Sequence, residues 1–465
     1  MKRKNLSTFI IFCILFAAFL AFPVENNAQN KKDIRKAQKL TAEGNKSFLT
    51  KDYRQAIDKY AEAVVLSPNY AEAHFWKGYA HYYLNEYDQA LTEINLAAEQ
   101  NYNKPLEIYK VRWFLNYNKK NYDAALDDAQ KGLQLAPDDI TMTMALGDIY
   151  RAQNKYQEAL AAYKKAAQLN PASGDIQYLI AVSQQNTGDA EGQQTNAAEA
   201  IKKGTKYVGE AYYLIADAHH KARKYPEALV AYKQSLASKD NIYEVYRGMA
   251  DIYRIQSRYS DAIEISNRGL KMFPNDGKIY TDLSWYYSLA NKHGDAIDAA
   301  QKAISLLPEQ SLAYTNLCRA HNDLKQYQLA ITSCNKALQI APNDGETNFY
   351  IGFAYTASNK PDEAAKYYPK AVAGLEEFTK NNPDYSDGFY LLGNAYTSNS
   401  EFDKAVESYK KSLDLSPRFA KARYNLGSIY KYLKKDDLAA AEYNALLEVD
   451  PGLAAKLKDV IDKKN

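Results

Sequence analysis

Cysteine and histidine are the residue types of this sequence best suited to nucleophilic catalysis or metal binding. Two of the three cysteines, Cys318 and Cys334, occupy positions that hold small residues or tyrosine elsewhere in the chain. We expect buried thiols there, with a disulfide as the alternative. His81, His219 and His321 share one recurring position that is often tyrosine, which is typical of packing. Because no CxxC, HExxH or phosphate-binding loop is present, the sequence predicts no enzyme, catalytic residue, metal site or cofactor.

A second set of side chains is suited to binding. Tyrosine is unusually abundant, at 41 of 465 residues, and aromatic rings offer stiff, partly polar contact area to extended peptides or sugars. Many tyrosines return at fixed positions of an internal repeat, where packing accounts for them. Other aromatic residues, with several charged ones, share one face of successive predicted helices.

This face carries the candidate ligand-binding residues. Its residues are Phe75, Tyr79, Tyr82, Tyr83, Lys110, Phe114, Tyr117, Asp148, Arg151, Asp217, Arg247, Asp251, Trp285, Phe349, Phe353, Tyr390 and Tyr424. Exposed rings at regular intervals are costly unless something covers them. A bound ligand is one explanation, and coverage of the rings by neighbouring repeats is the alternative.

A unit of 34 residues repeats along the chain. Residues 37–70 contain Gly44, Tyr53, Ala56 and Pro68, and the same residue types recur at these offsets. The Ala56 position returns as Ala90, Ala125, Ala159, Ala228, Ala262, Ala296, Ala330, Ala364, Ala405 and Ala439. The pattern resembles the tetratricopeptide repeat, a helix-turn-helix unit of this length. The resemblance implies an all-α, right-handed superhelical solenoid of about twelve units, in which one face of each first helix lines a concave groove.

The repeat also predicts the domain organisation. We expect a signal peptide at 1–28, a lead-in at 29–36, units 1–4 at 37–173, a degenerate unit 5 at 174–208, units 6–9 at 209–344, unit 10 at 345–385, units 11–12 at 386–453 and a capping helix at 454–465. In unit 5, Gln193 replaces the recurring alanine, which predicts low local stability or a bend. Unit 10 has seven extra residues, since Ala405 follows Ala364 after 41 positions. Its second helix should therefore be extended, and kinked at Pro369.

The N-terminal segment has the features of a secretory signal. Basic residues at 2–4 precede an apolar run from Phe9 to Phe22, and cleavage is expected between Ala28 and Gln29. An uncleaved inner-membrane anchor is the alternative, but the run of 14 residues is shorter than the roughly 18 that a spanning helix needs. We expect a periplasmic or secreted protein with no stable membrane span in the mature chain.

The family's carboxylate clamp, which holds the end of a peptide, is not conserved in the first three units. Thr41, Trp76, Glu107 and Val111 stand where its lysine, asparagine and basic pair would be. The net charge of +3 gives no basic face for nucleic acid. The sequence therefore predicts a non-enzymatic scaffold that binds an extended protein segment in an aromatic-lined groove, within a bacterial cell-envelope complex. The alternative is an extracytoplasmic carbohydrate-binding protein that uses tyrosine and tryptophan stacking.

Overall fold

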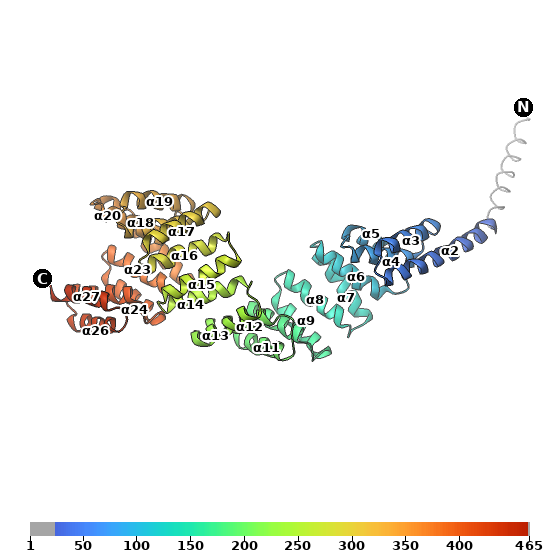
Figure 1. Ribbon diagram of the computed structural model, residues 1–465, viewed down its shortest axis with the longest axis horizontal. Coiled ribbons are helices and arrows are strands. Elements are labelled where there is room, and N and C mark those ends of the chain that lie inside the picture. Colours follow the sequence, from blue (N-terminus) through green and yellow to red (C-terminus); the bar gives the residue numbers. More distant parts are fainter. Residues whose placement is uncertain (1–23, 464–465) are drawn as a thin grey trace, which may run out of the picture. The chain divides into compact units, whose positions relative to one another are not determined.

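The computed structural model describes residues 24–463, and this range folds into α-helices joined by short turns (Figure 1). No strand occurs among these residues, so the predicted all-α solenoid is confirmed. The predicted signal peptide is mostly outside the described range, because residues 1–23 are not described. The predicted cleavage position between Ala28 and Gln29, and the lead-in, fall within the first described helix, α2.

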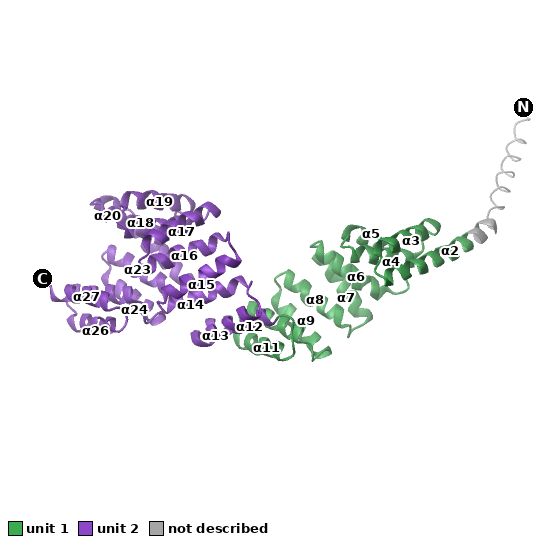
Figure 2. Ribbon diagram, in the orientation of Figure 1, with its two compact units in different colours: residues 1–207 green, residues 208–465 purple. Residues whose placement is uncertain are grey.

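The chain divides into two compact units, residues 1–207 and 208–465 (Figure 2). The described helices of the first unit are α2 (Val24–Leu49), α3 (Tyr53–Leu66), α4 (Ala71–Tyr83), α5 (Tyr87–Glu99), α6 (Pro105–Asn118), α7 (Tyr122–Leu135), α8 (Ile140–Ala152), α9 (Tyr156–Leu169), α10 (Gly174–Thr187) and α11 (Ala190–Lys202). Successive helices form pairs, and each pair corresponds to one 34-residue unit of the sequence.

The second unit continues the same pattern. Its helices are α12 (Val208–Lys221), α13 (Tyr225–Ser238), α14 (Tyr243–Ile255), α15 (Tyr259–Met272), α16 (Gly277–Leu289), α17 (His293–Leu306), α18 (Ser311–Asp323), α19 (Tyr327–Ile340), α20 (Gly345–Ala357), α21 (Pro361–Ala364), α22 (Tyr368–Asn381), α23 (Ser386–Ser398), α24 (Phe402–Leu415), α25 (Ala420–Tyr432), α26 (Asp436–Leu447) and α27 (Pro451–Asp462). The last helix, α27, buries Ala454 and Leu457 against the preceding pair, as a capping helix does.

The turn inside each pair has one backbone conformation throughout the described chain. A residue with positive φ lies in every such turn, between the first and the second helix; these residues are Lys51, Asn85, Lys120, Asn154, Gly188, Arg223, Ser257, Asn291, Lys325, Asn359, Ser400 and Lys434. A left-handed residue here ends the first helix and reverses the chain. The same turn therefore sets the same antiparallel pairing in each unit.

Glycine in the first helix makes room for a tyrosine ring of the second. A Cβ atom on Gly147 would lie 2.4 Å from Cε1 of Tyr163, and one on Gly393 would lie 2.6 Å from Cε1 of Tyr409. Both rings are almost completely buried and cannot move aside. The recurring glycine and the recurring tyrosine are thus two halves of one packing contact.

We expect Gly147→Ala to destabilise α8 and α9 by about 1–3 kcal/mol, because the added methyl group overpacks the contact with Tyr163. Hydrogen exchange of these two helices measures the effect. Gly294→Ala is the matched control, because a Cβ atom there meets nothing within 4 Å. The control should stabilise α17 by about 0.5–1 kcal/mol. Equal exchange in α8 and α9 before and after the Gly147 substitution would contradict the packing argument.

The fifth pair, α10 and α11, has a polar interior where other pairs have aromatic rings. Gln184 donates to Asp189 at 2.8 Å and accepts from Asn196 at 2.9 Å, and Gln193 is buried. The boundary between the two compact units falls between Tyr207 and Val208, at the end of this pair. The low stability predicted for this unit remains a prediction.

The second helix of the tenth pair differs from the expected single kinked helix. It consists of two helices, α21 and α22, joined by the turn of residues 365–367. Pro369 lies in the first turn of α22, where its missing N–H costs nothing. Proline therefore starts a new helix here instead of bending a continuous one.

The two cysteines of the ninth pair form a disulfide. Cys318 of α18 and Cys334 of α19 have Cα atoms 5.3 Å apart and are bonded through sulfur. The expectation of two free thiols was wrong, because the antiparallel pairing places the two residues opposite each other. The bond links the two helices of one unit.

The second unit closes on itself, so that α14 and α15, the seventh pair of the chain, meet α23 and α24, the eleventh pair of the chain (Figure 1). The guanidinium of Arg254 donates to Asp387, and these two side chains are 4% and 8% exposed. Ser416 Oγ donates to the carbonyl of Ile255 at 2.7 Å, and Ser257 Oγ donates to the carbonyl of Arg418 at 3.1 Å. Helices α14 to α25 therefore form a ring.

No helix within residues 24–463 combines the length and the apolar composition that crossing a membrane requires.

Candidate functional site

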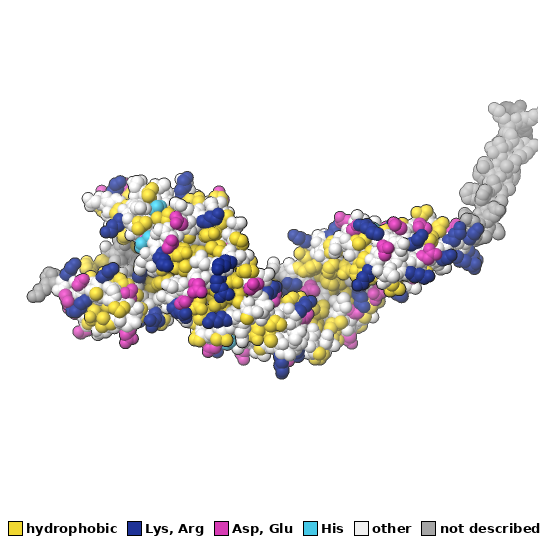
Figure 3. Space-filling model, in the orientation of Figure 1, with side chains coloured by type: hydrophobic (Ala, Val, Ile, Leu, Met, Phe, Trp, Pro, Cys, Tyr) yellow, Lys and Arg dark blue, Asp and Glu magenta, His cyan; other side chains and the backbone are white. Residues whose placement is uncertain are grey.

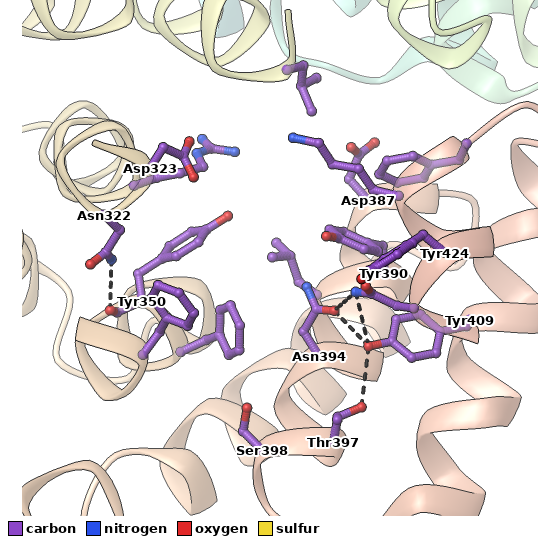
Figure 4. A pocket seen from close by; sticks show the side chains of 18 of the residues that line it. Asn322, Asp323, Tyr350, Asp387, Tyr390, Asn394, Thr397, Ser398, Tyr409 and Tyr424 are labelled. Carbon is purple, nitrogen blue, oxygen red and sulfur yellow. Dashed lines mark hydrogen bonds between the residues drawn. The ribbon is translucent and has the colours of Figure 1, made fainter. Parts of the chain in front are cut away.

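A half-open cavity of about 570 Å³ lies on the inner side of the ring of the second unit (Figure 4). Its walls come from the first helices of successive pairs, α16, α18, α20, α23 and α25, and Val460 of α27 also reaches it. Five of the predicted groove residues line it: Trp285, Phe349, Phe353, Tyr390 and Tyr424. These five come from four helices, α16, α20, α23 and α25, and each lies on the inner face of the first helix of its pair.

Charged residues line the cavity in balanced numbers: Arg319 and Lys421 are basic, and Asp323 and Asp387 are acidic. The guanidinium of Arg319 lies 5.8 Å from the ring centroid of Trp285 and 5.5 Å from that of Tyr350. Such cation–π contacts strengthen when they are removed from water.

Side-chain hydrogen bonds link α23, α24 and α25 along the side of the cavity that carries Tyr390 and Tyr424. Asn425 Nδ2 donates to Asn394 Oδ1 at 2.7 Å, and the hydroxyl of Tyr409 donates to the same oxygen at 2.7 Å. Opposite them, Asn322 Nδ2 donates to the carbonyl of Tyr350 at 3.0 Å (Figure 4). These bonds fix the orientation of the polar groups around the cavity.

Burial shifts the pKa values of two groups, one lining the cavity and one beside it. Burial raises the pKa of Glu346 to about 7, although the Arg319 guanidinium, 3.6 Å away, opposes the shift. Burial also lowers the pKa of the Lys421 ammonium, against the attraction of Asp323. Both shifts arise because a charged group in a poorly hydrated site loses solvation.

The Glu346 shift predicts a pH dependence of stability. Its usual pKa is 4.5 and its folded pKa is about 7, so the folded chain keeps a proton that the unfolded chain releases. The contribution of Glu346 to stability is therefore greatest below pH 4.5 and should fall by about 2–3 kcal/mol as the pH rises to 7. Hydrogen exchange of α18 and α20 across this pH range measures the slope.

Glu346→Gln should remove most of this slope, because glutamine does not titrate. Glu309→Gln, at an exposed position, is the matched control and should leave the slope unchanged. An equal slope in the Glu346→Gln protein and in the unsubstituted protein would show that another group is responsible.

In the first unit, a continuous series of packed rings crosses three first helices. It consists of predicted groove residues together with Phe48, which was not predicted. Phe48 of α2 stacks on Tyr79 of α4 at 5.5 Å, Tyr79 stacks on Tyr82 at 5.7 Å, and Tyr82 meets Phe114 of α6 edge-on at 5.4 Å. Tyr83 is 44% exposed, and Tyr79, Tyr82, Phe114 and Tyr117 are half-buried. We call the rings of Phe48, Tyr79, Tyr82, Tyr83 and Phe114 the aromatic series.

Phe75 differs from this expectation, because it lies in the core instead of on the groove face. Its ring is 4% exposed and stacks on Tyr102 at a centroid distance of 4.5 Å. Tyr102 belongs to the connection between α5 and α6, which folds back over Phe75. Phe75 therefore supports the neighbouring rings and is not available to a ligand.

The predicted polar stretch of the groove consists of residues that pair with one another or with near neighbours. Its contacts are Lys110 with Asp139 at 2.8 Å, Arg151 with Asp148 at 3.4 Å, Asp217 with Lys221 at 2.7 Å, Arg247 with Asp282 at 2.9 Å, and Asp251 with Arg254 at 2.7 Å. Most of these pairs are partly exposed and contribute little to stability. The structure does not bring these residues together into one site.

Several cavity residues were not predicted from the sequence. Arg319, Asn322 and Asp323 come from the ninth pair, for which no groove residue was proposed, and Asn394 and Lys421 lie beside predicted aromatic residues. The signal that could have found them is helical phase, since Asn394 follows Tyr390 by four residues on the same face of α23.

Two of the histidines illustrate the structural contacts of this residue type. His74 contacts Glu93 at 2.6 Å and the carbonyl of Pro68 at 2.9 Å, and His81 contacts Glu86 at 2.7 Å. Among the described residues no group of histidine, cysteine and carboxylate side chains could hold a metal ion. These contacts are those of packing positions.

Models of the tetratricopeptide repeat match more than half of the chain. Those described as TPR repeat match residues 44–85, 147–188 and 393–434, and those described as Tetratricopeptide repeat match 213–277, 311–344 and 420–453. The chain belongs to the tetratricopeptide repeat family. Proteins of this family bind other proteins or peptides.

Individual relatives match this tetratricopeptide repeat protein only in part. The small glutamine-rich tetratricopeptide repeat-containing protein 2 of Mycosarcoma maydis is 26% identical over 37% of this chain and 39% of its own length. The peroxisomal targeting signal receptor of Saccharomyces cerevisiae is 34% identical over 18% of this chain and 13% of its own length. The chain thus spans well under half the length of these relatives.

Among solved structures, the Cut9 and Hcn1 hetero-tetramer of the APC/C is similar over 92% of this chain and 97% of that one. The sequence identity is 14% and the TM-score is 0.43.

Proposed function

We propose that this protein is a non-enzymatic scaffold that binds an extended segment of another protein on the aromatic series of residues 24–207. The carrying observation is that stacked and edge-on ring contacts continue across α2, α4 and α6 while Tyr83 remains 44% exposed. Rings that are already packed lose little conformational freedom when a ligand binds, so their contact area contributes efficiently to affinity.

The hydrogen-bonding groups of the aromatic series suit a peptide. The hydroxyl groups of Tyr79 and Tyr83 lie 3.4 Å apart, beside apolar ring surface. Each hydroxyl can donate and accept, which fits the alternating N–H and C=O groups of an extended backbone. A relative named as a receptor for a targeting signal is consistent with a peptide ligand.

We place the protein outside the inner membrane, as part of a cell-envelope complex. The Cys318–Cys334 disulfide supports this location, because disulfides persist in oxidising compartments. The basic and apolar pattern of residues 2–22 supports it independently. On the face shown in Figure 3, basic and acidic side chains are interspersed, which favours a protein partner over nucleic acid.

Photo-crosslinking tests the binding surface. Benzoylphenylalanine in place of Tyr83, in the cell that makes the protein, should yield a discrete adduct with one envelope protein. Tyr82→Ala combined with Phe114→Ala should abolish this adduct. The matched control is benzoylphenylalanine in place of Tyr432, an exposed tyrosine of α25. No adduct from position 83, or the same adduct from both positions, would reject the proposed surface.

The location has its own test. Sequencing of the N-terminus of the purified protein should begin at Gln29, and the protein should appear in the periplasmic or secreted fraction. An N-terminus at Met1, with the protein in the cytoplasmic fraction, would reject the location and leave the binding surface untouched.

A further inference from the structure

Aromatic rings recur at one place on three successive first helices of the first unit. Phe48 of α2, Tyr82 of α4 and Tyr117 of α6 each lie four residues after the place of the recurring glycine, which is Trp113 in α6. All three side chains are half-buried, so part of each ring is accessible. We call them the repeated rings. In α8 the same place holds Arg151, so the repetition ends there.

The packing of the helices sets the distance between the repeated rings. Helix α2 packs against α4, and α4 packs against α6. The axes of packed helices lie about 8–10 Å apart, so equivalent places on these helices are separated by about the same distance. A ligand that contacts every repeated ring therefore needs side chains on one side at this interval.

The polyproline II conformation provides this interval. Three residues make one turn of about 9 Å, so every third side chain points to the same side. In a β-strand, the side chains of one face are about 6.7 Å apart, and they lose register with the helices within two steps. The ligand should therefore contact the repeated rings with residues i, i+3 and i+6.

The hydroxyl groups of the aromatic series favour the same ligand conformation. The hydroxyl oxygens of Tyr79 and Tyr83 lie 3.4 Å apart at the edges of their rings. The carbonyl groups of a polyproline II segment form no bond within the segment, so they can accept hydrogen bonds from tyrosine hydroxyls. The carbonyl groups of a helical ligand are already bonded within the helix.

The charged groups near the rings favour uncharged ligand residues. Arg151 and Asp148 act on the Tyr117 hydroxyl, and they pair with each other at 3.4 Å. Glu107 acts on the Tyr79 hydroxyl and pairs with a lysine at 3.6 Å. Proline is uncharged, its φ angle already suits polyproline II, and proline-rich segments dock in grooves lined by aromatic rings.

We propose that the protein segment bound in the first unit is proline-rich and adopts the polyproline II conformation, with proline at every third position over about seven residues. Its prolines lie on the repeated rings, and its carbonyl groups accept hydrogen bonds from the tyrosine hydroxyls of the aromatic series. This ligand class rests on the proposed function, the binding of a protein segment, and narrows it.

Ligand-observed NMR on the full chain tests the spacing with three peptides of seven residues. The first peptide has proline at its first, fourth and seventh positions, with serine and alanine between them. The second has the same composition with proline at its first, third and fifth positions, and the third has alanine in place of every proline. The first peptide should bind at least about fivefold more tightly than each of the others, because it alone matches the helix spacing in a preorganised conformation.

Substitutions of Tyr82 test the contact itself. Tyr82→Ala should weaken binding of the first peptide at least about tenfold, because the middle ring is lost. Tyr82→Phe keeps the ring and removes the hydroxyl, so it should weaken binding about threefold. Tyr432→Ala is the matched control, because Tyr432 is 64% exposed and lies in the second unit. The control should leave the affinity unchanged.

Equal binding of the first two peptides, or no binding of the first, would overturn the proline-rich ligand, and neither result depends on a variant. The photo-crosslink from position 83 does not require proline. An adduct whose cross-linked segment lacks prolines three residues apart would overturn the ligand class and leave the proposed function standing. Absence of the adduct would reject the binding surface and the ligand class together.

Discussion

Asp387→Ala is expected to destabilise the ring of helices α14 to α25 by about 3 kcal/mol or more, because the buried guanidinium of Arg254 then keeps only one of its two carboxylate partners. Arg254 is 4% exposed and donates to both Asp387 and Asp251. Removing one partner of a buried ion pair costs roughly 3–5 kcal/mol, and the remaining contact with Asp251 places the effect at the lower end. Hydrogen exchange of α14 and α23 measures the loss.

Asp384→Ala is a matched control for this prediction. Asp384 lies three residues earlier and pairs with Arg223, but their side chains are 76% and 45% exposed. Exposed pairs contribute about 0–1 kcal/mol, so the control should change exchange only slightly. If Asp387→Ala were as mild as Asp384→Ala, the Arg254 contact would not hold the ring closed.

A double-mutant cycle separates the contact from other effects of the substitution. Arg254→Ala combined with Asp387→Ala should cost less than the two single substitutions added together, because neither member of the Arg254–Asp387 pair is then left buried without the other. Strictly additive losses would show that the two residues act independently.

Loss of the disulfide is expected to have the second large effect. Cys318→Ser combined with Cys334→Ser should lower the stability of α18 and α19 by about 3 kcal/mol, because the bond closes a loop with a sequence separation of 16 residues. Hydrogen exchange of α18 and α19 is the direct measurement. Reductant should act on the unsubstituted protein in the same way.

The double-serine protein is also the control for the reductant. Adding reductant to it should change nothing, since the other cysteine, Cys13, lies far from this pair in the sequence. Because α18 also carries Arg319 and Asn322, faster exchange after reduction should extend to the cavity wall. Unchanged exchange in α18 after complete reduction would mean that packing alone holds this pair.

The sequence predicted those structural features that depend on contacts between residues close together in the chain. The recurring glycine and tyrosine contact each other within one helix pair, as Gly147 and Tyr163 do, so the pairs could be predicted from the repeat. The inner face of each first helix was assigned from helical phase, and one cavity is lined by five residues of that face: Trp285, Phe349, Phe353, Tyr390 and Tyr424. That they bind a ligand stays a prediction. Helical phase alone predicted that Phe75 lies on the groove face. Its burial depends on Tyr102, which belongs to the connection between α5 and α6 that the repeat pattern does not predict.

By itself, then, the sequence determined the helix pairs, their approximate boundaries and the face that carries the aromatic side chains, because these depend on contacts between residues less than about one repeat apart. Only the tertiary structure decided that Arg254 meets Asp387 across 133 positions, that the cysteines are bonded, and that a cavity results. Ring closure depends on small rotations that accumulate over several stacked pairs. No single position in the sequence encodes their sum.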